Sequence, residues 1–349
     1  MTHTSKLDYI IVGQGISGTC IAYQLIKKGF KVLVVDGGHA KSASAVAAGL
    51  YNPIVFKRFT ESWLAHELIN YLDSFYAEFE TLLNVKIHRK LNIVKILSNQ
   101  AEVDLWKKKS LNTKFMFENI STDYFSSSVK KNEGLGFVEH SGAVDVLTFI
   151  SEFRKYLTST NSLLEDVFDY DEISNQENKI TYKGLDAKAI VFCEGANAMF
   201  NPYFPQKAFK LTHGELIDIE ANDLPTNEVL NKGVFVLPFG GNNYHVGSTY
   251  EWELVDGDTS EKGLNELVSK LENVLSVSYK IAKHKAGIRP TVADRRPLIG
   301  KNNNHSNLYF FNGMGTKGVM LAPYFSEIFV NHLLSNTPFD SEIDIARYY

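Results

Sequence analysis

The chain of 349 residues has few cysteines and prolines: two cysteines, Cys20 and Cys193, and nine prolines. Two cysteines cannot form the disulfide framework of a small secreted domain, and their spacing matches no metal-ligand motif. We therefore expect both thiols to be buried small side chains, and we expect no metal site. No low-complexity tract, internal repeat or linker rich in Pro and Ser interrupts the chain.

Long apolar runs and a strong net charge are also missing. No run of 18 apolar residues occurs, and residues 1–6 do not begin a signal peptide. A formal net charge of −4 supplies no global field that attracts nucleic acid. Lysine runs at 107–109 and 130–131 are more often solvated faces than RNA contacts. We expect a cytoplasmic protein without a membrane segment, tRNA is not the favoured partner, and the oligomeric state is left open.

What is present is the composition of an ordinary globular enzyme. Hydrophobic residues make up 44% of the chain and charged residues 22%, which argues against disorder. The length suggests two domains of about 150 residues each, either in series or interleaved.

The first forty residues follow the pattern of a βαβ unit. An apolar run at 7–12 ends in glycines, apolar residues at helical spacing follow at 17–28, and a second strand is predicted at 31–35. The sequence Gly-Gln-Gly-Ile-Ser-Gly (13–18) lies between the strand and the helix, the context in which G-x-G-x-x-G is meaningful.

Each glycine of this motif has a mechanical task. Gly13 permits the tight turn, Gly15 lets the backbone approach a pyrophosphate, and Gly18 allows close packing of helix and strand. Asp36 ends the second strand, 18 positions after Gly18, where a carboxylate can accept hydrogen bonds from both ribose hydroxyls and disfavours a 2′-phosphate. The unit predicts a dinucleotide site without separating NAD from FAD.

Helical and strand patterns alternate along the rest of the chain. Helices are predicted at 62–83, 141–157, 261–275 and 319–334, with a solvated helix or loop at 106–114. Strands are predicted at 85–97, 186–192, 209–220, 234–238, 244–250 and 308–311. Dinucleotide-type elements thus occur at the beginning, middle and end of the chain, with strand-rich sequence between them. This order favours two interleaved domains.

Several segments resemble the D-amino acid oxidase and glycine oxidase family of FAD-dependent oxidoreductases. They include the βαβ unit, a run of small residues at 41–53, Gly-Ile-Arg-Pro at 287–290 with 294–300, and Gly-Met-Gly-Thr-Lys-Gly at 313–318 with 321–323. Within the family, 49–53 and 313–318 look most like the FAD-dependent oxidase domain of the bifunctional tRNA 5-methylaminomethyl-2-thiouridine biosynthesis protein. The methyltransferase half of that protein has no counterpart in this chain.

The resemblance implies an α/β fold, α+β overall. A Rossmann-like FAD-binding domain (1–84, 140–205 and 286–349) would be interleaved with an antiparallel-sheet substrate domain (85–139 and 206–285). It implies non-covalent FAD, because no cysteine lies near the C-terminal loop. The residues expected around the cofactor are Gly13, Gly15, Ile16, Ser17, Gly18, Asp36, Gly37, Ser42, Ser44, Ala48, Gly49, Leu50, Val167, Glu194, Gly195, Gly313, Met314, Gly315, Thr316, Lys317 and Gly318.

Arg289 is the residue that we expect to bind the substrate. A guanidinium holds a carboxylate through two parallel hydrogen bonds and so fixes its orientation; the alternative is a structural ion pair with Asp294 or another acid. Tyr250 is expected to cover the pocket, with ordinary core packing as the alternative. Phe235 stands where glycine oxidases have a tyrosine that helps to hold the carboxylate, so glycine is not the expected substrate.

These residues predict an FAD-dependent oxidase that removes a hydride from the carbon beside an amine in a carboxylate-bearing substrate, with dioxygen as acceptor. Two alternatives use the same flavin. One is an oxidase acting on a carboxymethylaminomethyl-type wobble uridine of tRNA. The other is a dehydrogenase that passes electrons to a partner.

Overall fold

We describe the protein from a computed structural model, which covers residues 6–38, 42–117, 127–130, 132–176, 179–224, 227–252 and 257–349. The strands in these ranges form two large sheets and two small ones. No helix in these ranges combines the length and the apolar character needed to cross a bilayer.

The first large sheet has six strands in the order β18-β19-β12-β1-β2-β8. They are β1 (Tyr9–Val12), β2 (Val32–Val35), β8 (Leu163–Leu164), β12 (Ala189–Phe192), β18 (Leu298–Lys301) and β19 (Leu308–Asn312). All neighbours pair in parallel except β18, which runs antiparallel to β19 at one edge. The βαβ unit predicted at the N-terminus therefore supplies two central strands of this sheet.

Both faces of the six-stranded sheet are covered, which explains why its strands are apolar without interruption. Tyr9 and Ile11 of β1 belong to a core shared with the helices α1 (Ile16–Lys27), α3 (Ala65–Leu83), α5 (Val146–Ser159) and α7 (Gly318–Ser335). Ile10 and Val12 point to the other core, beneath the small sheet β9 (Ile173–Gln176), β10 (Lys179–Tyr182) and β11 (Leu185–Ala187).

The second large sheet has eight strands in the order β17-β13-β16-β15-β14-β6-β7-β3. They are β3 (Leu50–Tyr51), β6 (His88–Leu97), β7 (Gly134–Val144), β13 (Thr212–Glu220), β14 (Val229–Asn231), β15 (Phe235–Gly240), β16 (Asn243–Gly247) and β17 (Lys280–Arg289). Only the β14–β6 pair is parallel. The predicted hairpin is confirmed as β15 and β16.

Helices also cover this second sheet on both faces. Val94 and Ile96 pack with Leu267 and Leu271 of α6 (Glu261–Glu272), whereas Ile93 and Leu97 face the cluster that contains Trp106 of α4 (Gln100–Ser110). The solvated helix or loop predicted at 106–114 was wrong in its start and at Trp106, whereas Lys107 and Lys108 are exposed as predicted. The helix begins six residues earlier, capped by Asn99, and Trp106 is fully buried against Phe59.

Two other predicted elements need correction. The helix predicted at 141–157 begins only at Val146, because Ser141 and Gly142 pair with β6 as the end of β7. The strand predicted at 186–192 is two strands, since β11 turns back on β10 before β12 enters the parallel sheet. The strand β17 was not predicted; its burial pattern lacks a clear alternation.

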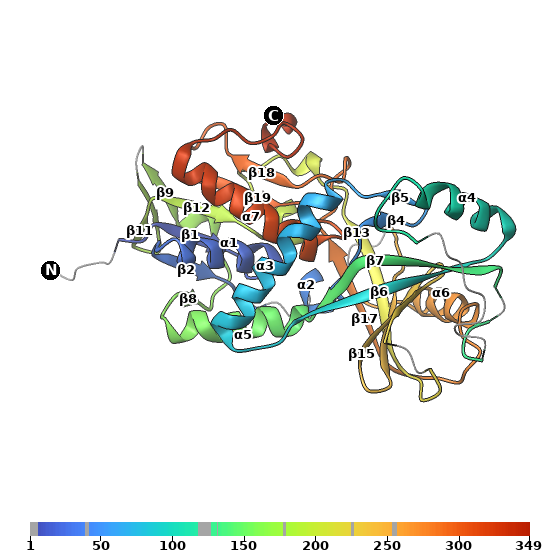
Figure 1. Ribbon diagram of the computed structural model, residues 1–349. Helices are drawn as coiled ribbons and strands as arrows, with labels where there is room; N and C mark the ends of the chain where they lie inside the picture. The colour runs from blue at the N-terminus through green and yellow to red at the C-terminus, as the bar shows by residue number, and fades with distance from the viewer. Residues whose placement is uncertain are drawn as a thin grey trace.

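The two large sheets lie in the two halves of the molecule, with the short helix α2 (Ala43–Val46) between them (Figure 1). The remaining pair, β4 (Ile54–Val55) and β5 (Thr60–Glu61), lies near α4. The predicted domain boundaries stay a proposal. They follow the two sheets except that β17 runs across residue 285 and β3 and part of β7 join the eight-stranded sheet.

Candidate cofactor and substrate site

A cavity of about 890 Å³ extends along the carboxyl ends of the parallel strands and reaches the eight-stranded sheet. This is the edge at which open parallel sheets bind ligands. Of the predicted site residues, Gly13, Gly15, Ile16, Ser17, Asp36, Gly37, Ser42, Ser44, Ala48, Gly49, Leu50, Val167, Glu194, Gly195, Met314, Gly315, Thr316, Lys317, Gly318 and Arg289 line it. Gly18, Gly313 and Tyr250 do not.

The turn between β1 and α1 leaves no room for side chains. Gly13 has a φ of 93°, and a Cβ there would lie 2.8 Å from the Cys193 carbonyl oxygen. A Cβ on Gly18 would lie 1.8 Å from the carbonyl oxygen of Gly13, so Gly18 serves helix packing and does not face the cavity. Gly15 caps α1 without a side-chain hydrogen bond, which leaves N–H groups of the first turn for a ligand.

The segment after Asp36 folds as a short helix packed against β17. Ser42 caps α2 by accepting a hydrogen bond from Ala45 N, and Ser44 Oγ accepts one from Ile16 N at 3.1 Å. A Cβ on Gly287 of β17 would lie 3.4 Å from the Ala43 Cα, so α2 and β17 lie within van der Waals distance of each other. The predicted run of small residues began at Lys41, which lies outside the described residues.

Glu194 lies in the turn after β12 and is one of the acids of the cavity wall. Its carboxylate accepts hydrogen bonds from Tyr170 Oη and from Asn201 Nδ2, the latter at 2.7 Å. Burial raises the pKa of Glu194 to about 7, although both hydrogen bonds act in the opposite direction. The carbonyl of the neighbouring Gly195 accepts a hydrogen bond from Asn312 Nδ2 at 2.9 Å, which ties this turn to β19.

The loop at 313–318 closes another side of the cavity. Gly313 has a φ of 76°, and a Cβ there would meet Val292 and the backbone of Leu298, so it packs away from the cavity. Burial lowers the pKa of Lys317 to about 8. The Lys317 ammonium has no hydrogen-bond or ion-pair partner within the described part of the chain, and it is a cation available to an anionic or electron-rich ligand.

Arg289 ends β17 with its guanidinium at the cavity wall. Nη1 donates to the carbonyl oxygens of Thr249 and His213 at 3.3 and 3.4 Å, and Nη2 donates to Thr249 O at 3.4 Å. Burial lowers the pKa of Arg289. The alternative partner, Asp294, pairs instead with Arg347 at 2.9 Å, and no ion pair of Arg289 is found among the described residues.

Two neighbours determine where this guanidinium lies. A Cβ on Gly214 of β13 would fall 1.9 Å from Arg289 Nη2, so the guanidinium lies directly on the glycine backbone. Tyr250 contacts Arg289 from the outside, with its ring centroid 5.6 Å from Cζ, and is itself exposed. Tyr250 therefore packs against Arg289 but does not line the cavity. Because its side chain is exposed, it is not an ordinary core residue either.

Phe235, on β15, lines the cavity, as the comparison with glycine oxidases implied. Its ring lies 3.0 Å from the position of a Cβ on Gly247. A phenyl ring offers a substrate no hydrogen-bond donor, so the cavity wall lacks a hydroxyl group at this position.

Sequence reasoning missed other wall residues, among them Phe200 and Gly214. Phe200 is 77% exposed and Val167 76%, so both present apolar surface at the cavity wall. Nothing in the sequence marked Phe200. Gly214 carried a signal, since a glycine inside a strand often marks a close approach.

The other residues singled out from the sequence lie elsewhere. Arg296 pairs with Glu342 and stacks on Trp63, and Arg295 is exposed. Lys107 and Lys108 are exposed on the last turn of α4, and Lys131 lies outside the described residues. Both cysteines are buried, as predicted. Within the described ranges, no cluster of three or more His, Cys, Asp and Glu side chains could hold a metal ion.

Comparisons with known proteins point to one family. A sequence profile described as "FAD dependent oxidoreductase" matches residues 8–331. A glycine oxidase from Bacillus licheniformis is 25% identical over 359 residues, which cover 95% of this chain and 94% of the relative. The tRNA 5-methylaminomethyl-2-thiouridine biosynthesis bifunctional protein MnmC from Acinetobacter baylyi is 22% identical over 95% of this chain and 53% of its own length.

A solved structure shares the fold. Iminodiacetate oxidase from Chelativorans sp. BNC1 superposes with a TM-score of 0.81 at 17% identity, over 97% of this chain and 98% of that one. The predicted fold class is confirmed by this likeness and by the two sheets.

Proposed function

Because the chain belongs to the family of FAD-dependent oxidoreductases, we propose that it oxidises the C–N bond of an amine or amino acid that carries a carboxylate, with dioxygen as electron acceptor. Amino-acid oxidase chemistry is the coarser conclusion that the relatives support. The proposal adds three points to it: the substrate carries a carboxylate, its C–N bond is oxidised, and dioxygen is the electron acceptor.

The cavity fits FAD. Its volume of about 890 Å³ is in the range of cofactor sites. The glycines of the β1–α1 turn and the start of α1 would hold the pyrophosphate, and Asp36 the adenosine ribose. The exposed apolar side chains of Val167 and Phe200 would cover the adenine. Ser42 to Leu50 and Met314 to Gly318 would flank the flavin.

Arg289 is the observation that carries the substrate proposal. A half-buried guanidinium whose hydrogen bonds within the described residues go to backbone carbonyls, at 3.3 to 3.4 Å, keeps donors for a carboxylate. Within the described residues no acid neutralises it, so an anionic substrate would supply the missing counter-charge.

The remaining task of the protein is orientation. When bound, FAD accepts a hydride at N5, so the flavin supplies the redox chemistry. Arg289 would hold the carboxylate so that the carbon beside a neutral amine faces the flavin, and this positioning needs no enzyme base. The substrate would lose a hydride to become an iminium ion, which water hydrolyses, and dioxygen would take up the two electrons to give hydrogen peroxide.

The test is anaerobic bleaching of the flavin by a panel of N-alkyl glycines, D-amino acids and L-proline. Arg289→Ala should raise the substrate concentration for half-maximal bleaching at least about 30-fold, because one partner of a partly buried ion pair is lost, and should leave FAD bound. The control Arg296→Ala removes an arginine seven positions away that pairs with Glu342. It should leave the substrate concentration for half-maximal bleaching and the bound FAD unchanged.

A second variant moves the guanidinium but keeps its charge. Gly214→Ala places a methyl group where Arg289 now lies, so it should weaken substrate binding in the same direction with bound FAD unchanged. Bleaching that is unaltered in both variants would show that Arg289 does not bind the substrate. Bleaching without peroxide on re-aeration would favour a dehydrogenase that passes electrons to a partner.

A second candidate substrate is a carboxymethylaminomethyl-type wobble uridine of tRNA, because MnmC is among the relatives. This substrate would present a carboxylate and a secondary amine to the same Arg289. Bleaching by modified tRNA, in the absence of bleaching by the small-molecule panel, would select it.

A further inference from the structure

The turn between β1 and α1, at 13–15, carries a single side chain, that of Gln14. Gly13 and Gly15 on either side of it have none, and their wide conformational freedom has to be restricted if the turn is to hold a ligand in one place. Gln14 is completely buried. Its contacts are therefore the side-chain contacts through which the rest of the protein can fix this turn.

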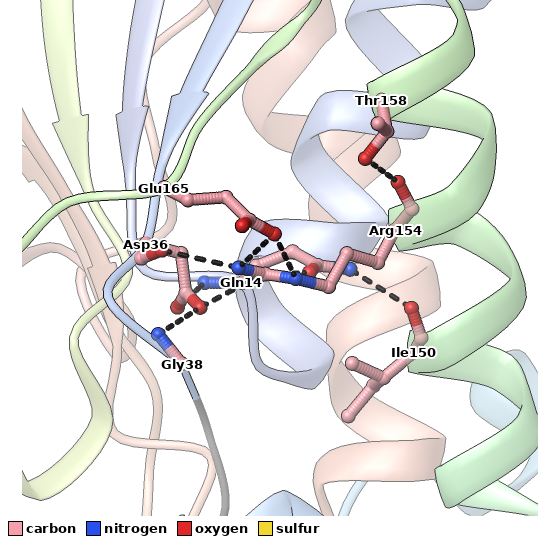
Figure 2. A network of polar contacts seen from close by, with 7 residues as sticks. All are labelled: Gln14, Asp36, Gly38, Ile150, Arg154, Thr158 and Glu165. Atoms are coloured by element: carbon pink, nitrogen blue, oxygen red, sulfur yellow. Dashed lines mark hydrogen bonds and ion pairs between the residues drawn. The ribbon is translucent and has the colours of Figure 1, made fainter.

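Both polar atoms of the Gln14 side chain are hydrogen-bonded to α5 (Figure 2). Gln14 Nε2 donates to the carbonyl oxygen of Ile150 at 2.9 Å, and Gln14 Oε1 accepts from Arg154 Nη1 at 2.9 Å. Ile150 and Arg154 are four residues apart and lie on the same face of the helix. One face of α5 thus holds both ends of the buried amide.

Arg154 is itself held in place. Its Nη1 also donates to Asp36 Oδ1 at 2.9 Å, and its Nη2 donates to the Asp36 carbonyl oxygen at 3.3 Å. Nε and Nη2 donate to Glu165 Oε1 at 3.2 and 3.1 Å. The Arg154 side chain is 18% exposed, so its guanidinium is a largely shielded, fixed donor to Gln14.

The N–H groups of the turn show what this anchoring achieves. Three of the four N–H groups at 13–16 donate within the protein, to Val35 O, Asp36 Oδ2 and Ser44 Oγ. The fourth, that of Gly15, donates no hydrogen bond in the described part of the chain and is left for a phosphate oxygen. The peptide unit between Gln14 and Gly15 is planar, so the Gln14 backbone fixes the direction of this N–H group.

We propose that Gln14, held by Arg154, is a positioning residue for the pyrophosphate of FAD: it directs the Gly15 N–H group toward a phosphate oxygen. This inference rests on the placement of the pyrophosphate at the β1–α1 turn in the proposed function. It concerns cofactor binding alone, and it does not depend on which amine is oxidised.

The experiment measures how ADP and adenosine displace FAD from the whole chain, followed by flavin fluorescence. The two ligands share adenine and ribose and differ in the phosphates, so the ratio of their affinities isolates the phosphate contacts. In the wild type, ADP should bind at least about 30-fold more tightly than adenosine, since N–H groups of the turn and of the first turn of α1 meet the phosphates. A wild-type ratio near one would overturn the inference.

Gln14→Met keeps the length of the side chain but has neither amide group. In this variant the ratio should fall about tenfold, the loss expected when one hydrogen bond to a charged group is misdirected. A purely structural role of Gln14 gives a different result. It would weaken ADP and adenosine alike and leave the ratio at its wild-type value, which would contradict the proposal.

Arg154→Met removes the donor to Gln14 Oε1 from the other side of the contact. It also removes the contacts to Asp36, but these act on the adenosine half that both ligands share and cancel in the ratio. The ratio should therefore fall in this variant as well, and the double variant should fall no further than Gln14→Met, because both residues act through one contact. If Gln14→Met does not fold, an unchanged ratio in Arg154→Met overturns the proposal by itself.

The matched control is Gln24→Met, the same substitution at another buried glutamine of α1. Gln24 is 4% exposed, donates to Tyr71 Oη at 2.8 Å and is not among the described residues that line the cavity. Whatever stability this control loses, its ratio should match the wild type. A fall equal to that in Gln14→Met would attribute the effect to loosening of α1 and contradict the positioning role. If FAD binds normally but no amine bleaches it, the proposed function fails while this inference is still testable.

Discussion

At the scale of single residues, two side chains mark the proposed substrate end of the cavity. Arg289 keeps hydrogen-bond donors for a ligand, and the ring of Phe235 has no donor. Arg289 and Phe235 lie on β17 and β15 of the same sheet and line the same cavity. Under the proposed function, Phe235 would offer the substrate carboxylate no hydrogen bond, and Arg289 would hold that carboxylate.

Phe235→Tyr should restore the hydroxyl donor. We expect the concentration of a small carboxylate substrate such as glycine or sarcosine at half-saturation to fall about 3- to 10-fold, which corresponds to one neutral or charge-assisted hydrogen bond. Steady-state peroxide production for wild type and variant measures this change. Equal values, with FAD bound in both, would mean that residue 235 does not face the carboxylate.

At the scale of elements, α5 positions the groups that hold Asp36 and the glycine turn. The helix begins where β7 ends, and Asp145 stops the strand and caps the helix. The Asp145 carboxylate accepts hydrogen bonds from Thr148 N at 3.0 Å and from Thr148 Oγ1 at 2.7 Å. Arg154 and the Ile150 carbonyl follow two turns and one turn later, so the start of α5 determines where both lie.

Asp145→Ala should lower the free energy of unfolding by about 1 kcal/mol, since the first turn loses its side-chain cap. Urea unfolding of the apoprotein measures the change, and Asp145→Ser, which keeps a capping oxygen, should recover most of it. A full loss in both variants would show that the aspartate acts through something other than the cap.

At the scale of the whole molecule, the cavity is lined by residues of both large sheets. Burial shifts the pKa values of ionisable groups in its wall toward the neutral form. Glu194 is the clearest of them, with a pKa of about 7 in the folded chain against 4.5 in an exposed one. Between these pH values the folded state binds more protons than the unfolded state. The free energy of unfolding therefore falls as pH rises from about 4.5 to 7, and stays lower above pH 7.

Glu194→Gln should remove this dependence and keep both partners, because an amide can accept from Asn201 and donate to Tyr170. The variant apoprotein should be more stable than the wild type at pH 8 by roughly 1 to 3 kcal/mol, with little difference at pH 4.5. Chemical denaturation at the two pH values tests this. A stability difference that is identical at both would contradict a titration of Glu194.

The local features of the cofactor site could be read from the sequence. The turn at Gly13, the helix start after Gly15 and the strand end at Asp36 were predictable, because each depends on neighbours within a few tens of residues. Arg289 was found through the motif around it. The alternative weighed for it, an ion pair with Asp294, does not form, since proximity in sequence says little about which ion pair forms.

Contacts between distant segments were decided only by the tertiary structure. Arg154 lies 118 residues from Asp36, and Gly214 lies on a different strand from the guanidinium that it supports. Neither pair leaves a periodic pattern, because each depends on how helices and strands pack after they have formed. The sequence by itself determined which cofactor-binding unit the chain would build. The packing of α5 on β2 and of β17 on β13 decided how its acid and its arginine are held.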